Sequence, residues 1–201
     1  QEKIKRSKIR QMSSDQSKPQ TAPEQKKSNI DSTQSSISKK TENITPEFEG
    51  SLINQLVTRF GDKLVKVIYV RPGRTKILVP PNEIVQVASF IRDSLGFDHA
   101  ESVSGTDYPN DNQIEVIYHL SSYSDDKLSS QILALSTRVD RNQSTMPTLI
   151  DIFKSSEYHE RETFEMLGVY FDGHPRNERF LLPEDWADIP PLRKEFRIKG
   201  R

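Results

Sequence analysis

The sequence predicts an α+β domain in which helices flank a mostly antiparallel sheet, with a disordered N-terminal tail before it and an extended C-terminal arm after it. Two stretches repeat apolar residues with helical spacing, and several stretches of strand-like composition are separated by short turns. Strands and helices in separate runs are typical of α+β folds. We therefore expect three regions, at residues 1–45, 46–186 and 187–201.

Residues 1–45 are predicted to form a disordered basic tail. They are mostly Gln, Ser, Lys and Thr, and they carry ten Lys and Arg against five Asp and Glu. So few apolar residues cannot bury enough surface to offset the entropy lost on folding. Contact with a nucleic acid or an anionic membrane is an open interpretation of such a tail, although no aromatic residue is interleaved for base stacking.

The composition excludes several kinds of site. The chain has no Cys, and therefore no thiolate-bound iron–sulfur cluster, Cys-type zinc site or disulfide. Its eight glycines match neither the dinucleotide-binding GxGxxG pattern nor a phosphate-binding loop. His159 and Glu160 begin like a zinc-binding HExxH helix, but Thr163 stands where the second His is needed. No stretch approaches the roughly 18 apolar residues of a membrane span.

The first half of the predicted domain contains a helix and a β-hairpin. Apolar residues follow a helical period over residues 48–60, and Gly61 then ends the helix. Residues 64–70 and 75–79 are predicted strands, joined by a tight turn that contains Pro and Gly. We expect the basic residues around this hairpin to form a solvated tip: Lys63, Arg71, Arg74 and Lys76.

A second helix and a three-stranded meander follow the hairpin. A pair of prolines starts the helix and Gly96 ends it. Its apolar face consists of Ile84, Ala88, Ile91 and Leu95. Residues 97–108, 113–121 and 127–139 have strand-like composition and are separated by turns, so they predict antiparallel strands in sequence order. Alternation along the middle strand makes Glu115 an outward-facing residue.

The next predicted helix, which follows a short helical turn at residues 147–153, carries three consecutive charges. Glu160, Arg161 and Glu162 fan over roughly 200° of a helix and cannot all point away from the core. A buried charge is costly unless it is paired, so the triplet indicates either an internal ion network or a face for a partner. We expect Arg161 to lie between Glu162 or Glu165 and a carboxylate of a partner.

Turn residues follow this helix. Gly168 is expected at its C′ position, Gly173 in a turn, and the sequence His174-Pro175 favours an extended backbone. Two roles are open to His174: it can carry a proton, because its ordinary pKa is near neutrality, or it can fix a turn by hydrogen bonding. We favour the turn. Trp186 is predicted to anchor packing or an interface.

The C-terminal residues 187–201 are predicted to form an extended docking arm. They are rich in basic side chains, including Arg193 and Lys194, and show hardly any core-forming period. We expect the arm to lie on a partner.

The stretch from Glu160 to Trp186 resembles the signature of the C subunit, also called the 30 kDa subunit, of NADH-quinone oxidoreductase, which is respiratory complex I. The matching residues are Glu160, Arg161, Glu162, Phe164, Glu165, Met166, Leu167, Gly168, Phe171, Gly173, His174, Pro175 and Arg179. So long an ordered pattern is hard to meet by chance. The similarity extends over most of the chain after about residue 50. Departures from the family pattern indicate a distant branch: Tyr158 (usually Trp), Glu165 (Asp), Leu167 (Phe), Glu178 (Arg) and Pro190 (His).

The resemblance implies a cofactor-free structural subunit in the peripheral arm of the enzyme, with no catalytic, cofactor-binding or metal-binding residue of its own. NADH, FMN, iron–sulfur clusters and quinone would then belong to partners, which are the D subunit (49 kDa type) and the adjacent iron–sulfur subunits. The expected interface residues are Glu160, Arg161, Glu162, Gly168, Gly173, His174, Pro175, Arg179, Trp186, Arg193 and Lys194.

The same resemblance places the chain on the cytoplasmic side of the cell membrane, or on the matrix side of the mitochondrial inner membrane. The membrane would be reached only through the complex, and no nucleic acid is an expected partner. Two alternatives stay open. One is the equivalent subunit of a deazaflavin- or hydrogenase-linked relative of complex I, and the other is a nucleic-acid-associated binding protein.

Overall fold

The computed structural model describes residues 47–183, 185–186 and 189–197. The elements, in chain order, are α1 (Glu47–Phe60), β1 (Lys66–Arg71), β2 (Arg74–Leu78), η1 (Pro81–Glu83), α2 (Ile84–Leu95), β3 (His99–Tyr108), η2 (Pro109–Asp111), β4 (Gln113–Ser121), β5 (Ile132–Asp140), β6 (Thr145–Pro147), η3 (Lys154–Ser156), α3 (Glu157–Leu167) and β7 (Tyr170–Asp172). The predicted tail, residues 1–45, lies outside the described residues. Within the described part, no helix is long and apolar enough to cross a membrane.

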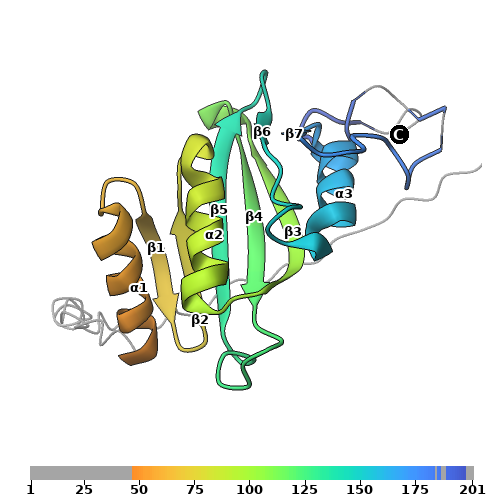
Figure 1. Cartoon of the computed structure of the whole chain (residues 1–201). Helices are drawn as coiled ribbons and strands as arrows, with labels where there is room; N and C mark the ends of the chain where they lie inside the picture. The colour runs from red at the N-terminus through yellow and green to blue at the C-terminus, as the bar shows by residue number, and fades with distance from the viewer. Residues whose placement is uncertain (1–46, 184, 187–188, 198–201) are drawn as a thin grey trace, which may run out of the picture. The chain divides into compact units, whose positions relative to one another are not determined.

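Five strands form one sheet in the order β1-β2-β5-β4-β3. All neighbouring pairs are antiparallel except β2 and β5, which run parallel and join the predicted hairpin to the predicted meander. Helices α1 and α2 lie on one face of this sheet, and α3 lies beside the edge strand β3 (Figure 1). The predicted α+β class with a mostly antiparallel sheet is confirmed.

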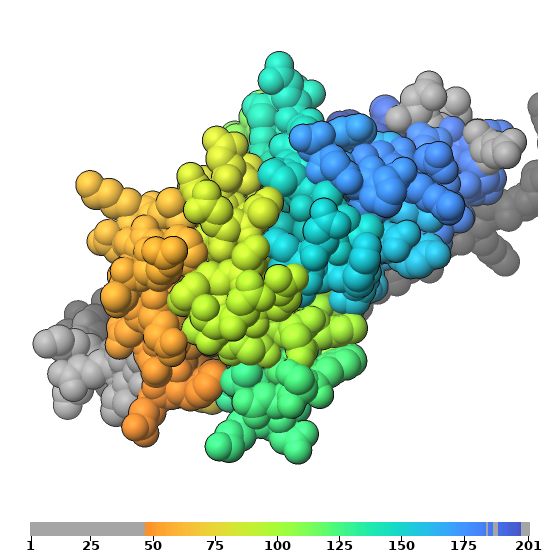
Figure 2. All heavy atoms as spheres, viewed as in Figure 1, coloured from red at the N-terminus to blue at the C-terminus, as the bar shows by residue number. Residues whose placement is uncertain are grey.

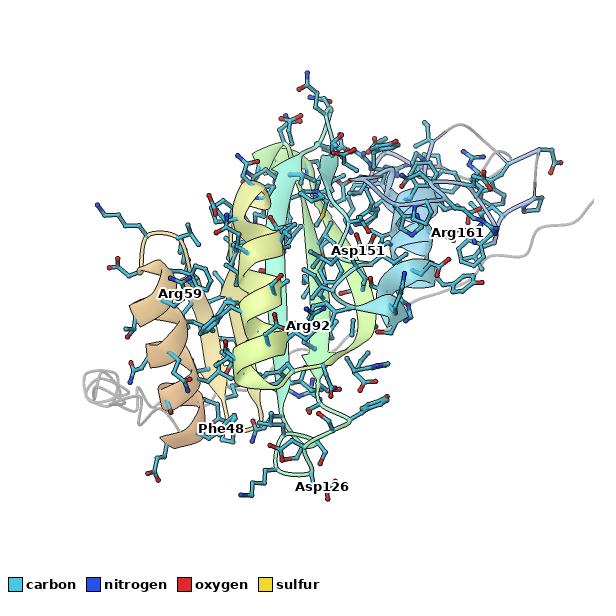
Figure 3. All side chains as sticks on the ribbon, in the orientation of Figure 1. Phe48, Arg59, Arg92, Asp126, Asp151 and Arg161 are labelled. Carbon is cyan, nitrogen blue, oxygen red and sulfur yellow. The ribbon has the colours of Figure 1, made fainter. Side chains whose placement is uncertain are left out.

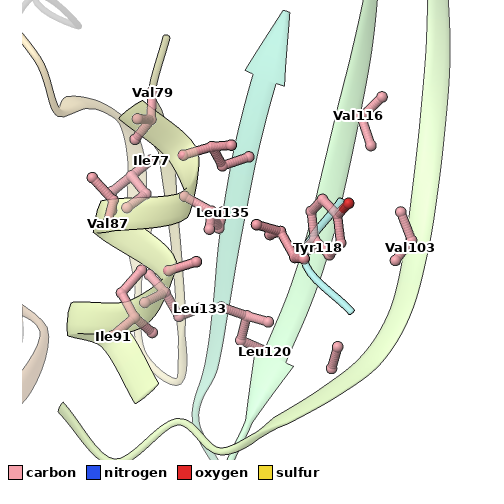
Figure 4. Close-up of a cluster of buried hydrophobic side chains, with 14 of the residues drawn as sticks. Ile77, Val79, Val87, Ile91, Val103, Val116, Tyr118, Leu120, Leu133 and Leu135 are labelled. Carbon is pink, nitrogen blue, oxygen red and sulfur yellow. The ribbon is translucent and has the colours of Figure 1, made fainter. Parts of the chain in front are cut away.

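The core lies between the sheet and the helices on its covered face. Val87 and Ile91 of α2 point toward Leu133 and Leu135 of β5, and all four side chains are buried (Figure 4). Burying a side chain of this size contributes about 1.5–3 kcal/mol. Because every second residue of a strand faces the same side, the regular apolar alternation in β2, β4 and β5 supplies the opposing surface.

A small second sheet was not predicted. Strands β6 and β7 pair in parallel, and the N–H of Tyr170 donates to the carbonyl of Ser144 at 2.7 Å. The N–H of Thr148 donates to the carbonyl of Asp172 at 2.9 Å. Each strand has only three residues, which is too short for an alternating pattern to be visible in the sequence. The pairing brings the chain that leaves α3 back beside the chain that enters it.

The third strand of the meander is shorter than predicted. We expected a strand over residues 127–139, but β5 begins at Ile132 and the preceding residues form turns. The Asp125 carboxylate accepts a hydrogen bond from the N–H of Lys127 at 2.9 Å. Such a local side-chain contact competes with the strand ladder and holds the backbone in a turn.

Glu115 lies on the sheet face opposite the core, as predicted, but it is only 2% exposed. Its carboxylate lies 2.8 Å from the ammonium of Lys76, and it accepts a hydrogen bond of 3.2 Å from the hydroxyl of Tyr108. The guanidinium of Arg138, on the adjacent strand β5, lies 3.9 Å from the same carboxylate. Lys76 is therefore part of an ion pair on the sheet rather than of a solvated tip.

Residues 189–197 contain no helix or strand, and they follow successive turns on the surface of their own domain. The N–H of Leu192 donates to the carbonyl of Met166 at 2.9 Å, and the N–H of Arg193 donates to that of Pro190 at 3.1 Å. These residues therefore do not run extended, and the compact domain continues past its predicted end. Docking of this segment on a partner stays a prediction.

Candidate functional site

Helix α3 carries the charged residues and packs closely on the sheet at Gly105. A Cβ added to Gly105 would lie 2.1 Å from Cδ1 of Leu167, so only a glycine allows this contact. Gly168 ends the helix with φ 74°, and its N–H donates to the carbonyl of Phe164 at 2.8 Å. The C′ role predicted for this glycine is confirmed.

The three consecutive charges of α3 lie in three different environments. Glu160 is fully buried, Arg161 is 8% exposed and Glu162 is exposed. The prediction that at least one charge faces protein is therefore confirmed. Figure 3 shows Arg161 on the side of α3 that lies away from the sheet.

Glu160 is held by donors from three parts of the chain. Its Oε1 accepts hydrogen bonds of 2.9 Å from the Tyr118 hydroxyl on β4 and from the N–H of Leu149. The hydroxyls of Thr148 and Ser156 also donate to this carboxylate. Burial raises the pKa of Glu160, while the hydrogen bonds act in the opposite direction. The side chain thus ties β4, the loop after β6 and α3 together.

His174 fixes a turn beside the first turn of α3. Its Nδ1 accepts a hydrogen bond of 3.0 Å from the N–H of Arg176, and its Nε2 lies 3.1 Å from the carbonyl of Glu157. A ring that accepts at Nδ1 and faces a carbonyl at Nε2 is neutral with its proton on Nε2. The turn-fixing role that we favoured matches this geometry. Gly173, with φ 83°, makes the turn before it, and the neighbouring Pro175 is exposed.

Arg161 is held by aromatic rings rather than by the carboxylates that we predicted. Its guanidinium carbon lies 4.5 Å from the ring centre of Phe180 and 5.7 Å from that of Tyr158. Its Nε donates weakly to the carbonyl of Glu178 at 3.4 Å. Among the described residues, no carboxylate forms an ion pair with Arg161. Pairing with Glu162 or Glu165 is therefore wrong.

The carboxylate of Glu165 is bound by backbone groups and not by Arg161. Three consecutive N–H groups donate to it, from Phe180 at 3.1 Å, Leu181 at 2.9 Å and Leu182 at 2.7 Å. Burial alone would raise the pKa of Glu165, but these donors and the charge of the exposed Arg179 hold it below its ordinary value. The carboxylate thus fixes the loop at residues 180–182, which follows the turn at Gly173.

The C-terminal segment is bound to the end of α3 through Arg193. Its guanidinium donates to the carbonyl of Leu167, to the carbonyl of Arg141 at 3.0 Å and to the hydroxyl of Ser144 at 3.1 Å. The N–H of Lys194 donates to Asp107 at 2.8 Å, whereas its side chain is exposed. Of the two basic residues that this segment contributes to the predicted interface, Arg193 is used inside the domain and Lys194 is on the surface.

Trp186 packs against the same segment. Its ring stacks on Phe196, with ring centres 5.9 Å apart and an interplanar angle of 18°. The packing role predicted for Trp186 agrees with this contact. Its indole Nε1 is buried and has no hydrogen-bond acceptor among the described residues.

Sequence reasoning missed the ion pair between Asp107 and Arg141. Two hydrogen bonds of 2.7 and 3.0 Å join the side chains, and Arg141 also contacts Glu195. This hydrogen bonding with Arg141 lowers the pKa of Asp107. A signal was present, because strand alternation puts Asp107 on the same face as the apolar Val103. An acid at such a position requires a partner.

The comparisons with known proteins agree with this fold. Residues 77–201 match the family model of the respiratory-chain NADH dehydrogenase 30 kDa subunit. The family match and the α+β fold together place the chain in the class of respiratory-chain subunits. The chain belongs to the complex I 30 kDa subunit family, and the resemblance seen in the signature is confirmed.

Similar curated proteins come from bacteria and from an archaeon. The NADH-quinone oxidoreductase C subunit of Roseiflexus sp. is 40% identical over 129 residues, which cover 63% of this chain and 71% of that protein. The F420H2 dehydrogenase C subunit of Methanosarcina mazei is 30% identical over 146 residues, which cover 73% of this chain and 90% of that protein.

Two solved structures share the fold. A chain of the membrane-bound sulfane sulfur reductase, an archaeal respiratory membrane complex, matches with a TM-score of 0.62 and 24% identity, over 76% of this chain and 88% of that one. A trypsin-resistant fragment of Nqo5 matches with a TM-score of 0.54 and 20% identity, over 63% and 97%.

Proposed function

We propose that this chain is a cofactor-free structural subunit in the peripheral arm of a quinone-reducing respiratory complex. The observation that carries the proposal is how the charged side chains of α3 and of the C-terminal segment are used. Glu160, Glu165 and Arg193 each bind several backbone or hydroxyl groups and so hold loops on α3. A catalytic acid or base has to reach a substrate, whereas these groups are occupied inside the domain.

The space next to α3 supports the same proposal. A pocket of about 180 Å³ lies between β3, α3 and Leu192, and apart from Glu162 it is lined mainly by small and apolar residues. Ligand sites for cofactors usually occupy about 300–1,000 Å³. In the described part of the chain, no group of three or more His, Asp or Glu is placed to hold a metal ion. The space beside α3 is smaller than such cofactor sites, and we propose that the partner subunits carry the electron transfer.

The partners we propose are the D subunit and the adjacent iron–sulfur subunits, at the cytoplasmic side of the cell membrane. We propose NADH as the electron donor of the complex, because several NADH-quinone oxidoreductase subunits are among its relatives. A deazaflavin-linked complex is a second candidate, and the observation that favours it is the similarity to the C subunit of F420H2 dehydrogenase over 90% of that protein. The mitochondrial inner membrane, matrix side, is the alternative location.

The experiment is depletion of the chain in its host, followed by quinone-reduction assays on membranes with NADH and with reduced F420 as donors. The expected result is loss of assembled complex and of the activity with one donor. The purified chain is expected to show no flavin or iron–sulfur absorption and no NADH oxidation. A stoichiometric chromophore, or unchanged membrane activity, would overturn the proposal.

The nucleic-acid alternative is tested by a salt titration of binding to duplex DNA, which should weaken steeply with salt if the basic residues act as a DNA surface. The geometry disfavours this alternative, because Arg193 is turned into its own domain.

A further inference from the structure

Two exposed aromatic side chains lie next to the buried Arg161, and a third exposed apolar side chain, that of Leu181, follows the second of them in the chain. Tyr158 is 60% exposed, Phe180 is 40% exposed and Leu181 is 50% exposed. The rings of Tyr158 and Phe180 meet edge to face with centres 6.0 Å apart, and the guanidinium of Arg161 lies within 6 Å of both rings. We call these four residues the aromatic platform.

The aromatic platform is rigidly built. Phe180 and Leu181 are fixed through their backbone N–H groups, which the Glu165 carboxylate binds. Tyr158 and Arg161 are three residues apart on α3 and so lie on one face of the helix. Large apolar side chains that are fixed in an exposed position contribute strongly to binding, since little conformational entropy is lost when they are covered.

The electrostatics of the platform select the chemistry of its occupant. Arg161 is 8% exposed, and its only hydrogen bond to a described residue is the weak one to Glu178. Contact with aromatic rings offsets part of the cost of covering a guanidinium, but a buried cation is stabilised fully only by an anion. Glu165, one turn further along α3, forms no ion pair with Arg161 among the described residues, and three N–H groups bind its carboxylate instead.

We propose that the aromatic platform is the docking site for an apolar segment of a neighbouring subunit that carries an Asp or Glu onto the guanidinium of Arg161. The apolar part of the segment covers Tyr158, Phe180 and Leu181, and its carboxylate completes the charge pair. This inference rests on the proposed function, because it requires a complex in which a second subunit faces α3.

A phosphate-bearing partner fits the platform less well. Glu162 is exposed and lies four residues after Tyr158, hence on the same side of the helix. Its carboxylate repels a nucleic-acid backbone or an anionic lipid surface. A single carboxylate carries less charge than a phosphate-bearing surface, so it is repelled less, and its contact with the guanidinium is directed and charge-assisted.

The experiment is site-directed photo-crosslinking in the complex purified from membranes. The photoreactive amino acid p-benzoylphenylalanine replaces Tyr158 in one variant and Leu181 in a second, and Arg161 stays intact in both. The control is the same replacement at Tyr123, which is also aromatic and is 70% exposed in the loop after β4. We expect both platform positions to link to one segment of another subunit, apolar and with an Asp or Glu, and position 123 to link elsewhere or not at all.

A charge exchange then tests the ion pair itself. Arg161→Glu should lower recovery of the chain in the complex roughly thirtyfold or more, as expected when a buried charge pair is broken. Replacing the cross-linked Asp or Glu by Arg in the same strain should restore recovery. The cross-linking variants keep Arg161. The cross-linking result therefore remains valid even if Arg161→Glu fails to fold.

The outcomes separate this inference from the proposed function. If the chain is recovered in the complex but its platform positions link to nothing, to a second copy of this chain, to lipid or to a segment without an acid, the inference is overturned and the proposed function stands. If the unmodified chain is absent from the purified complex, the proposed function fails first.

Discussion

The hydroxyl of Tyr118 on β4 donates a hydrogen bond of 2.9 Å to the carboxylate of Glu160 on α3, and both side chains are excluded from solvent. The two residues are 42 positions apart in sequence. Tyr118 also belongs to the apolar core, so one side chain joins the packing of the sheet to the polar network of the charged helix.

In the space-filling view, the residues before α3 continue the surface of α2 over the sheet (Figure 2). Arg92 of α2 contacts them, through the carbonyl of Ile152 at 3.2 Å.

Removing the Tyr118 hydroxyl should destabilise the domain. Tyr118→Phe keeps the ring in the core but leaves the buried Glu160 with one donor fewer, which costs about 1–3 kcal/mol. Urea unfolding of the purified chain measures this difference. Tyr123→Phe is the control, because its hydroxyl donates to Glu101 at the surface and its loss should cost less than about 0.5 kcal/mol. Equal decreases in the free energy of unfolding in the two variants would show that the buried contact stabilises the domain no more than the surface contact does.

Replacing Glu165 should have an effect that depends on pH. The folded-state pKa of Glu165 lies below its ordinary value of 4.5, so its charge stabilises the folded state above that pH. This stabilisation is lost as the pH falls through the folded-state pKa. We therefore expect Glu165→Gln to be less stable than the unmodified chain at neutral pH, and the difference to shrink below about pH 4.5.

Unfolding free energies of both proteins between pH 3 and pH 7 measure this trend. Glu162→Gln is the matched control, since Glu162 is exposed on the same helix and its replacement should change stability by less than about 0.5 kcal/mol. A deficit of Glu165→Gln that grows as the pH falls would contradict the assignment of the carboxylate to the three N–H groups.

Local patterns were sufficient to predict α1, α2, the hairpin and the helix with three charges. Helical spacing and a stop glycine are local signals, and the fan of charges required one of them to be buried. The partners of those charges could not be predicted, because Tyr118 and Phe180 are brought to α3 only by the fold. The sequence pointed to acids as the partners of Arg161, whereas the structure places aromatic rings there.

The pairing of short strands that are distant in the chain could not be predicted from the sequence either. The parallel pairs β2–β5 and β6–β7 depend on which strands become neighbours, and a pattern within one strand does not identify its neighbour. Glu115 shows a related limit. Alternation predicted the sheet face of this residue correctly. Its carboxylate is buried, however, by the side chains of Lys76 on β2 and Arg138 on β5, which become its neighbours only in the assembled sheet.

Adding a methyl group to Gly105 should disturb the packing of α3. In Gly105→Ala, the new Cβ would lie 2.1 Å from Cδ1 of the buried Leu167, so α3 or the leucine has to move. Overpacking of this kind costs about 1–3 kcal/mol. Thermal unfolding measures the loss, and the double variant with Leu167→Val should recover part of it by making room. If the double variant is less stable than the sum of the two single changes predicts, the clash with Leu167 is not the cause.

Removing the guanidinium of Arg193 should release the C-terminal segment from α3. The group binds two carbonyls and one hydroxyl, and a hydrogen bond from a charged donor contributes about 1.5–3 kcal/mol. In Arg193→Ala, the amide of Leu192, which donates to Met166, should exchange its hydrogen roughly tenfold faster or more. Proteases should also cut residues 189–197 sooner. Lys194→Ala is the matched control, because only the backbone of Lys194 contacts Asp107 and its side chain is exposed. Equal protection in the two variants would mean that the segment is held by its backbone hydrogen bonds and by the stacking of Phe196 on Trp186, without a contribution from Arg193.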